Sequence, residues 1–252
     1  MTKLEQGINE YLSGDVNSAI KLFTSYLDDG GVPSGEVYYY MGLALSDIGK
    51  MEEAGRYFNK AVELEPNKGM YHYRLALTYD NMMLFQMAIP HLMKTLEQNP
   101  EHVRAHLILG KIYFKNGDMQ TAAEQFRQVT RISPDYARGY HELGLSLYYQ
   151  GKTAEALGTF EKALSLDNED ADSHHKMARI LMDAKEYDEA ISHLYKAYEL
   201  GFDELAFISH FVLTLIAGER KDEARKLLDR AEAYLPDSPE LTKLRNILEK
   251  DV

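Results

Sequence analysis

Apolar residues along this chain fall into pairs of helical stretches. Between Gly35 and Ile48 they recur at the i, i+3, i+4 spacing of an amphipathic helix, and Gly49 then predicts a helix end. A second amphipathic stretch runs from Glu52 to Leu64, and Pro66 cannot continue it because proline lacks the amide donor. The pattern therefore predicts a unit of helix, short turn, helix and break.

This unit returns at a fixed distance of 34 residues. One alanine marks the same place in the second helix of successive units, at Ala54, Ala88, Ala122, Ala156, Ala190 and Ala224, and Ala19 precedes the series by 35 residues. A small residue in five of the first helices, at Gly42, Ala76, Gly110, Gly144 and Ala178, is expected where the two helices approach closely, and the seventh has Val212 there. Such a period predicts stacked helix pairs, since each pair buries its apolar face only against its neighbours.

The repeat divides the chain into seven expected units and a final helix. The units span residues 1–34, 35–68, 69–102, 103–136, 137–170, 171–204 and 205–236. After Pro236, the apolar residues Leu241, Leu244, Ile247 and Leu248 lie among charged ones, which predicts a helix over 237–252 that seals the open end of the core. The expected fold class is an all-α, right-handed superhelical solenoid.

Composition narrows the classes of function. The 252 residues include no cysteine, which excludes disulfides, thiolate metal sites and a cysteine nucleophile. The formal net charge of -12 disfavours nucleic acids and anionic membrane surfaces as partners. No stretch has the roughly 20 apolar residues that span a bilayer, and the first residues lack the pattern of a secretory signal. We therefore expect a cytoplasmic protein without a cofactor.

Two units carry the residues of a known repeat most completely. The fifth unit has Tyr140, Leu143, Gly144, Ala156, Phe160 and Ala163, and the fourth has Leu109, Gly110, Tyr113, Gly117, Ala122, Phe126 and Pro134. In these positions the chain resembles the tetratricopeptide-repeat family, whose unit is a 34-residue helix–turn–helix. The resemblance extends over about seven units, from the N-terminus to Pro236. It implies a noncatalytic scaffold that binds protein segments in a concave groove.

In this family, the residues that contact the ligand are usually the second, fifth, sixth, ninth, twelfth and thirteenth of each unit, on the first helix. In units three to six these concave positions hold seven basic residues, Arg74, Arg104, Lys111, Lys115, Arg138, Lys176 and Arg179, and four acidic ones, Asp80, Glu142, Asp172 and Asp183. The candidate site also includes His141 and the aromatic residues Tyr39, Tyr40, Tyr73, Phe114, Tyr148 and Tyr149. Arg and Tyr are residues that often carry binding energy at interfaces. Because the groove is basic and aromatic while the whole chain is acidic, it predicts an acidic peptide or helix as the partner.

Histidines raise the alternative of an enzyme. His141, His175 and His210 approach one wall of the groove, but equivalent positions of stacked repeats are expected to lie too far apart for a compact metal site. The sequence contains no Gly-rich phosphate loop, Ser-centred elbow or HExxH motif. A separate group, His72, His106 and His174, occupies an early aromatic position of the repeat and is expected to pack inside. We therefore predict no catalytic or metal-binding residue.

A second alternative is a scaffold that assembles with itself into a homo-oligomer. It would use the apolar residues at its two ends, Leu213, Ile216 and Ala217 in the seventh unit and Leu4, Ile8, Tyr11 and Leu12 in the first. A head-to-tail contact of this kind builds rings or filaments. The apolar residues of the seventh unit could equally cradle the last helix of the chain.

Overall fold

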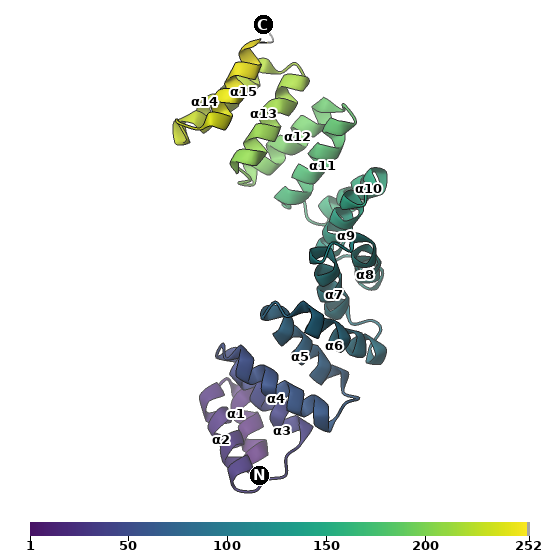
Figure 1. Ribbon diagram of the computed structural model, residues 1–252, viewed down its shortest axis with the longest axis vertical. Helices are drawn as coiled ribbons and strands as arrows, with labels where there is room; N and C mark the ends of the chain where they lie inside the picture. Colours follow the sequence, from purple (N-terminus) through teal and green to yellow (C-terminus); the bar gives the residue numbers. More distant parts are fainter. Residues whose placement is uncertain (251–252) are drawn as a thin grey trace. The chain divides into compact units, whose positions relative to one another are not determined.

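The computed structural model describes residues 1–250, and every regular element among them is an α-helix (Figure 1). The helices are α1 (Lys3–Ser13), α2 (Val16–Asp28), α3 (Gly35–Asp47), α4 (Met51–Leu64), α5 (Gly69–Asn81), α6 (Phe85–Gln98), α7 (Val103–Lys115), α8 (Met119–Ile132), α9 (Ala137–Tyr149), α10 (Thr153–Leu166), α11 (Ala171–Asp183), α12 (Tyr187–Glu199), α13 (Leu205–Ala217), α14 (Lys221–Tyr234) and α15 (Pro239–Lys250). The predicted all-α fold class is confirmed. None of the helices within residues 1–250 is long and apolar enough to cross a membrane.

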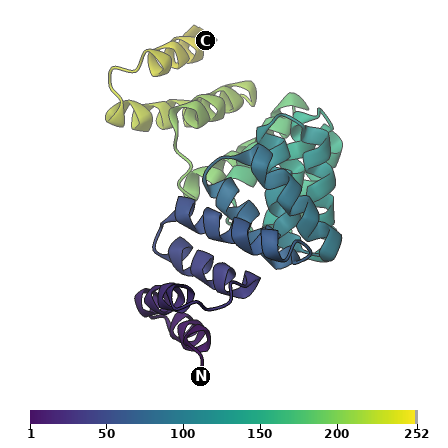
Figure 2. The same cartoon turned by 60° about the horizontal axis from the view of Figure 1, so that its bottom comes forward.

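The helix pairs, called repeats from here on, are grouped into two larger compact units, Met1–Ile132 (unit 1) and Ser133–Val252 (unit 2). Unit 1 contains the antiparallel pairs α1–α2, α3–α4, α5–α6 and α7–α8, and unit 2 contains α9–α10, α11–α12 and α13–α14 (Figures 1 and 2). Within each unit, the second helix of one pair also packs against the first helix of the next. The first helices therefore form one layer of each unit and the second helices another.

Each helix pair is packed through a match between a small and a large residue. In four pairs the small residue is glycine and the large one phenylalanine: Gly7 with Phe23, Gly42 with Phe58, Gly110 with Phe126 and Gly144 with Phe160. A Cβ on any of these glycines would lie 2.6 to 2.8 Å from the phenylalanine ring. Where the small residue is Ala76, Ala178 or Val212, the residue in the phenylalanine position is Leu92, Leu194 or Leu228. The close approach expected at the small residues is thus confirmed. A glycine faces the larger phenylalanine, and an alanine or valine faces the smaller leucine.

The last helix covers the apolar end of unit 2. Leu241, Leu244 and Leu248 of α15 are buried in the cluster that includes Phe207 and Phe211 of α13. The Arg245 guanidinium of the same helix lies 2.6 Å from a carboxylate oxygen of α14. The buried face of α13 therefore holds the last helix. Of the residues that the sequence alternative named for this role, Leu213 and Ala217 are exposed and Ile216 is half-buried.

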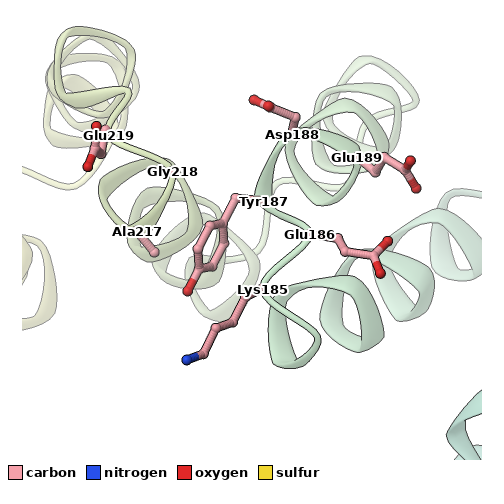
Figure 3. A pocket seen from close by; sticks show the side chains of 8 residues that line it. All are labelled: Lys185, Glu186, Tyr187, Asp188, Glu189, Ala217, Gly218 and Glu219. Atoms are coloured by element: carbon pink, nitrogen blue, oxygen red, sulfur yellow. The ribbon is translucent and has the colours of Figure 1, made fainter.

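The turn inside each pair needs a residue with positive φ. Gly49, Gly117 and Gly151 supply it, but in other turns Met83, Lys185 and Glu219 stand there, with φ of 58°, 64° and 61°. In this conformation a Cβ crowds the following carbonyl oxygen. Figure 3 shows two of these turns, at Lys185 and Glu219, bordering one surface cleft with the ring of Tyr187 between them.

Replacing Lys185 by Gly is expected to raise the free energy of unfolding by about 0.5–1 kcal/mol. The relief of a left-handed side chain is worth roughly 1–2 kcal/mol, and the greater entropy of glycine in the unfolded chain offsets part of it. Urea denaturation followed by circular dichroism measures the change. The matched control is Gly151→Ala, which introduces a side chain at the same turn position and should destabilise the protein. A Lys185→Gly variant no more stable than wild type would contradict this account.

Candidate binding surfaces on the first helices

The concave positions of α5 and α7 form a basic surface in unit 1. Arg104 and Lys115 are exposed there, and Arg74 and Lys111 are half-buried. Asp80 is the one carboxylate at these positions of the two helices. Burial raises its pKa, while the charges of Lys115 and Lys111 act in the opposite direction, which places Asp80 within electrostatic reach of both. Four cations thus face a single carboxylate, which partly neutralises two of them.

Aromatic side chains line the same layer of unit 1 at different depths. Tyr73 is half-buried, and its ring centroid lies 4.4 Å from that of His102. Phe114 and Tyr40 are also half-buried. Tyr39 differs from the expectation, because it is only 7% exposed and packs against Phe58 and Tyr71. It therefore supports the core rather than offering a contact surface.

The sequence-based site left out two residues at the edge of this surface. The Tyr11 hydroxyl on α1 donates a 2.9 Å hydrogen bond to Asp47 Oδ2 on α3. Burial raises the pKa of Tyr11 to about 12, with the hydrogen bond and the charge of Asp47 adding to the rise and the charge of Arg74 opposing it. Asp47 is the thirteenth residue of its repeat, so extending the count of concave charges to the second repeat would have found it.

In unit 2 the charges at concave positions balance. Arg138 Nε lies 3.3 Å from Glu142 Oε1, and Lys176 Nζ lies 3.4 Å from Asp172 Oδ1, each pair being one turn apart on a single helix. Arg179 and Asp183 add one charge of each sign. The basic excess counted over the third to sixth repeats therefore comes entirely from the third and fourth repeats, whose first helices α5 and α7 lie in unit 1.

Two tyrosines at the end of α9 form an aromatic step in unit 2. Tyr149 is 54% exposed, and its ring makes an edge contact with that of Tyr148 at 5.3 Å. The Arg179 guanidinium lies 5.8 Å from the centroid of the Tyr148 ring, within the range of a cation–π interaction. Arg179 is thus held on an aromatic face rather than by a carboxylate.

His141 is part of a polar cluster between α9 and the start of α11. Its Nδ1 lies 2.8 Å from both Asp170 Oδ2 and Ser173 Oγ, and Ser173 Oγ donates to Asp170 Oδ2 at 2.6 Å. Burial alone would lower the pKa of His141, but the hydrogen bond and charge of Asp170, with the charges of Asp172 and Glu142, raise it overall. Burial opposes ionisation of Asp170, yet hydrogen bonds from His141 and Ser173 lower its pKa.

This arrangement of serine, histidine and aspartate is not a catalytic triad. A triad needs the nucleophile on one imidazole nitrogen and the carboxylate on the other. Here Ser173 and Asp170 approach the same nitrogen of His141, and the Ser173 hydroxyl donates to Asp170 instead of to the imidazole. The carboxylate on the other side of the ring, that of Asp172, lies 3.5 Å from Nε2. Asp170 also accepts from the Ser173 amide as the N-cap of α11, so the cluster fixes the start of that helix.

His175 and His210 lie together in unit 2, whereas His141 bonds to Asp170 and Ser173. The ring centroids of His175 and His210 are 5.4 Å apart, and His210 stands one residue later in its repeat than His175. Within residues 1–250, no three His, Asp or Glu side chains are grouped so that they could hold a metal ion.

The early-position histidines form a buried motif whose second half the sequence analysis missed. Nε2 of His72, His106 and His174 lies 2.9, 2.9 and 3.2 Å from the carbonyl oxygen six residues earlier. Nδ1 of each lies 2.8 Å from a side chain 19 residues later, respectively His91 Nδ1, Gln125 Oε1 and His193 Nδ1. The predicted packing role is confirmed, since all three rings are buried.

Comparison with protein-family models finds the same repeat in both units. Residues 35–68, 147–197 and 181–248 match models of the tetratricopeptide repeat, and residues 110–151 match a model described as TPR repeat. No curated protein matches the sequence.

Several solved structures share the fold. PilF of Pseudomonas aeruginosa has a TM-score of 0.68 at 21% identity, over 84% of this chain and 96% of that one. MamA of Desulfovibrio magneticus RS-1 has a TM-score of 0.62 at 24% identity, over 66% of this chain and 94% of that one. YrrB, described as a TPR protein with an unusual peptide-binding site, has a TM-score of 0.66 at 19% identity, over 74% and 95%. Together with the family-model matches in both units, this shared fold shows that the chain belongs to the tetratricopeptide-repeat family.

Proposed function

We propose that this protein is a noncatalytic scaffold that binds an acidic protein segment, in the cytoplasm, on the concave positions of unit 1. The family is a protein-interaction fold, and the choice of an acidic segment rests on one observation. The concave positions of α5 and α7 hold four basic residues, Arg74, Arg104, Lys111 and Lys115, and one acidic residue, Asp80, although the whole chain carries a net charge of -12. A local reversal of charge attracts a partner of opposite sign and steers its approach.

The aromatic residues give this surface contacts besides charge. Tyr73 and Phe114 are half-buried, so each keeps part of its ring available while its base is fixed by packing. Large aromatic side chains of this kind supply much of the energy at protein interfaces. Unit 2 has candidate contacts of its own at the tyrosines of α9 and the cations Arg138, Lys176 and Arg179, and His141 bonds to Asp170 at the start of α11.

The test is a selection of random 12-residue peptides displayed on phage, with wild-type protein as the bait. Enriched peptides should be acidic, and their affinity should fall at least tenfold for the variant Arg104→Glu/Lys111→Glu. Each exposed ion pair contributes roughly 0.2–1 kcal/mol, and reversing two charges replaces attraction by repulsion. Binding should also weaken between about 0.05 and 0.5 M salt, because ions screen surface charges.

The matched control is Lys21→Glu/Arg56→Glu. It makes the same change in net charge within unit 1, but on the second helices α2 and α4, where both side chains are exposed. The control should bind the selected peptides like wild type. If the enriched peptides are neutral or basic, or if both double variants weaken binding equally, the concave basic surface is not the acidic-segment site.

Self-assembly through apolar ends has less support than binding of a partner. At the C-terminal end, α15 covers Phe207 and Phe211 of α13, and Arg245 fixes that helix to carboxylates of α14. Leu213 and Ala217 stay exposed there. At the N-terminal end, Leu4, Ile8 and Tyr11 are half-buried against the core, and Leu12 is exposed. A molecular mass that rises with concentration in light scattering would favour the homo-oligomer over the proposal above.

A further inference from the structure

A cavity of about 360 Å³ opens between α11 and α13 in unit 2. It is lined from α11 by His175, Arg179, Met182 and Asp183 and from α13 by Ala206, Ser209, His210 and Leu213. All eight stand at the second, fifth, sixth, ninth, twelfth or thirteenth position of their repeats, the positions by which this family contacts ligands. The cavity exceeds the roughly 30 Å³ that one water occupies by about tenfold, so it has room for a side chain.

Two of the lining residues, His175 and His210, carry three buried ring nitrogens that have no hydrogen-bond partner within residues 1–250. They are Nδ1 of His175 and both ring nitrogens of His210. Nearly all buried polar groups in folded proteins are hydrogen-bonded, and an unsatisfied one is costly. The other buried histidines show the contrast, since His72, His106 and His174 each satisfy both nitrogens. Because these nitrogens are buried, a ligand in the cavity reaches them only when the two imidazole rings turn about χ2, and it would then supply hydrogen bonds that the protein does not.

The chemistry of the cavity calls for a group that both donates and accepts. Burial lowers the pKa of His175 to about 4, with His210, Lys176 and Arg179 adding to the effect. Burial likewise lowers the pKa of His210 to about 4, with Arg179 adding and Asp183 opposing. Both rings are thus neutral at physiological pH, and a neutral imidazole has one N–H donor and one bare nitrogen acceptor. Arg179 and Asp183, one turn apart at the rim, repeat this pairing of donor and acceptor.

A carboxamide matches this set better than a charged group does. A carboxylate only accepts and would face Asp183, whereas an ammonium or guanidinium only donates and would face Arg179. The carbonyl oxygen of a primary amide can accept from an imidazole N–H and from Arg179, while its NH2 donates to a bare imidazole nitrogen and to Asp183. Met182, Ala206 and Leu213 provide an apolar wall for the aliphatic part of the side chain. Arg179 and Leu213 are exposed, so small rotamer changes at the rim would admit it.

We propose that the cavity between α11 and α13 binds the side-chain carboxamide of an asparagine or glutamine in the partner polypeptide. This inference deepens the proposed function by assigning unit 2 an uncharged anchor, separate from the acidic contacts of unit 1. It agrees with the balance of charges at the concave positions of unit 2, where three cations stand against three carboxylates.

The test is a titration of the 252-residue protein, labelled with ¹⁵N and ¹³C in its histidine side chains, at pH 7.5. The probes are propionamide, propionate and N-methylacetamide, and the signals of His175 and His210 are identified with the variants His175→Gln and His210→Gln. Propionamide should shift both signals in a saturable way, with a dissociation constant of the order of 10 mM, as so few atoms allow. Propionate should bind at least tenfold more weakly. The signals of His174 and His193, which bond to each other, should not move.

Two results would overturn the proposal. If propionamide produces no saturable shift, water or a rearranged side chain already satisfies the imidazoles. If propionate or N-methylacetamide binds as tightly as propionamide, the cavity selects an anion or a backbone amide instead. The variant His210→Phe keeps a ring of similar shape and removes both nitrogens, so the shift at His175 should disappear in it.

The two proposals can fail independently of each other, because they are tested by different measurements. Acidic peptides selected on wild-type protein should still lose affinity through Arg104→Glu/Lys111→Glu if unit 1 binds them, whatever the fragment titration shows. Conversely, the fragment titration requires no peptide and reads the cavity directly. A glutamine at a constant place in the selected peptides should lose at least tenfold in affinity when changed to glutamate, and this loss should vanish with His210→Phe.

Discussion

Replacing Phe126 by Ala is expected to lower the free energy of unfolding by about 3–5 kcal/mol. The ring is fully buried and lies against Gly110, where a Cβ would come within 2.6 Å of it. Truncation leaves a cavity that the surrounding helices cannot fill, because Gly110 offers no side chain that could move in. Urea denaturation measures the loss, and Met93→Ala, an exposed apolar truncation on α6 of the same unit, should change stability little.

A double-mutant cycle tests the reason for this effect. Gly110→Ala alone should destabilise by about 1–3 kcal/mol, since it overpacks against the ring, and Phe126→Leu alone should leave a smaller cavity. The combination recreates the Ala76 and Leu92 pair of the third repeat, so it should be more stable than the sum of the two changes predicts. Additive losses would show that the two residues do not pack as a unit.

Lowering the pH from 7.5 to 5.0 is expected to destabilise the protein by about 2–4 kcal/mol through its buried histidines. The folded protein holds the pKa of His175 and His210 at about 4, whereas the ordinary value is 6.5. Below pH 6.5 the unfolded chain takes up protons that the folded chain refuses, so stability is full above 6.5 and is lost as pH falls towards 4. After a discount for partial exposure, each ring accounts for roughly 1 kcal/mol at pH 5.0.

The histidine pairs add to this loss. Because His72 Nε2 faces a carbonyl oxygen, it carries the proton, and its bare Nδ1 accepts from His91 Nδ1. Burial, with the charge of the partner histidine, lowers the pKa of His91 and of His193. A second proton would place two N–H groups against each other and break the bond. His141 works in the opposite direction, since its raised pKa makes its contribution greatest in acid and lost as pH rises.

Urea midpoints at pH 7.5 and 5.0 measure the acid effect, and His91→Gln/His193→Gln is the informative variant. Gln125 occupies the same place in the fourth repeat and cannot take up a proton in this range. The double variant should therefore fold at pH 7.5 and lose less stability at pH 5.0 than wild type. Equal midpoints for wild type at the two pH values would contradict the assignment of neutral, buried imidazoles.

Much of the architecture could be predicted from local patterns. The stretches Gly35–Ile48 and Glu52–Leu64 correspond to α3 and α4 to within one residue at each end. Gly49 lies at a left-handed turn, as expected for the residue that ends the first helix, and Gly117 and Gly151 take the same place in other repeats. The turns at Met83 and Lys185 keep this geometry with a side chain in place, because packing of the two helices imposes the turn.

The candidate site was predicted less completely. The position of a residue in its repeat does not reveal how deeply its side chain is buried or which charge it pairs with. Tyr39 follows the phase of the concave face, yet its neighbours Phe58 and Tyr71 bury it. Arg138 and Lys176 count as groove cations in the sequence, yet each has a carboxylate one turn away. The i, i+4 spacing of Arg138 and Glu142 could have revealed that pair, and the same spacing joins Asp172 and Lys176.

By itself, the sequence determined the helices, the repeat and the family of this protein. These follow from apolar spacing and from small, large and turn residues at constant phase, and backbone geometry translates such local patterns directly into structure. Only the tertiary structure decided which histidines are paired across 19 residues, how the basic excess is concentrated in unit 1, and that His175 and His210 border a cavity without partners. Those features depend on side-chain rotamers and on the register between neighbouring helices, which no periodicity along the chain encodes.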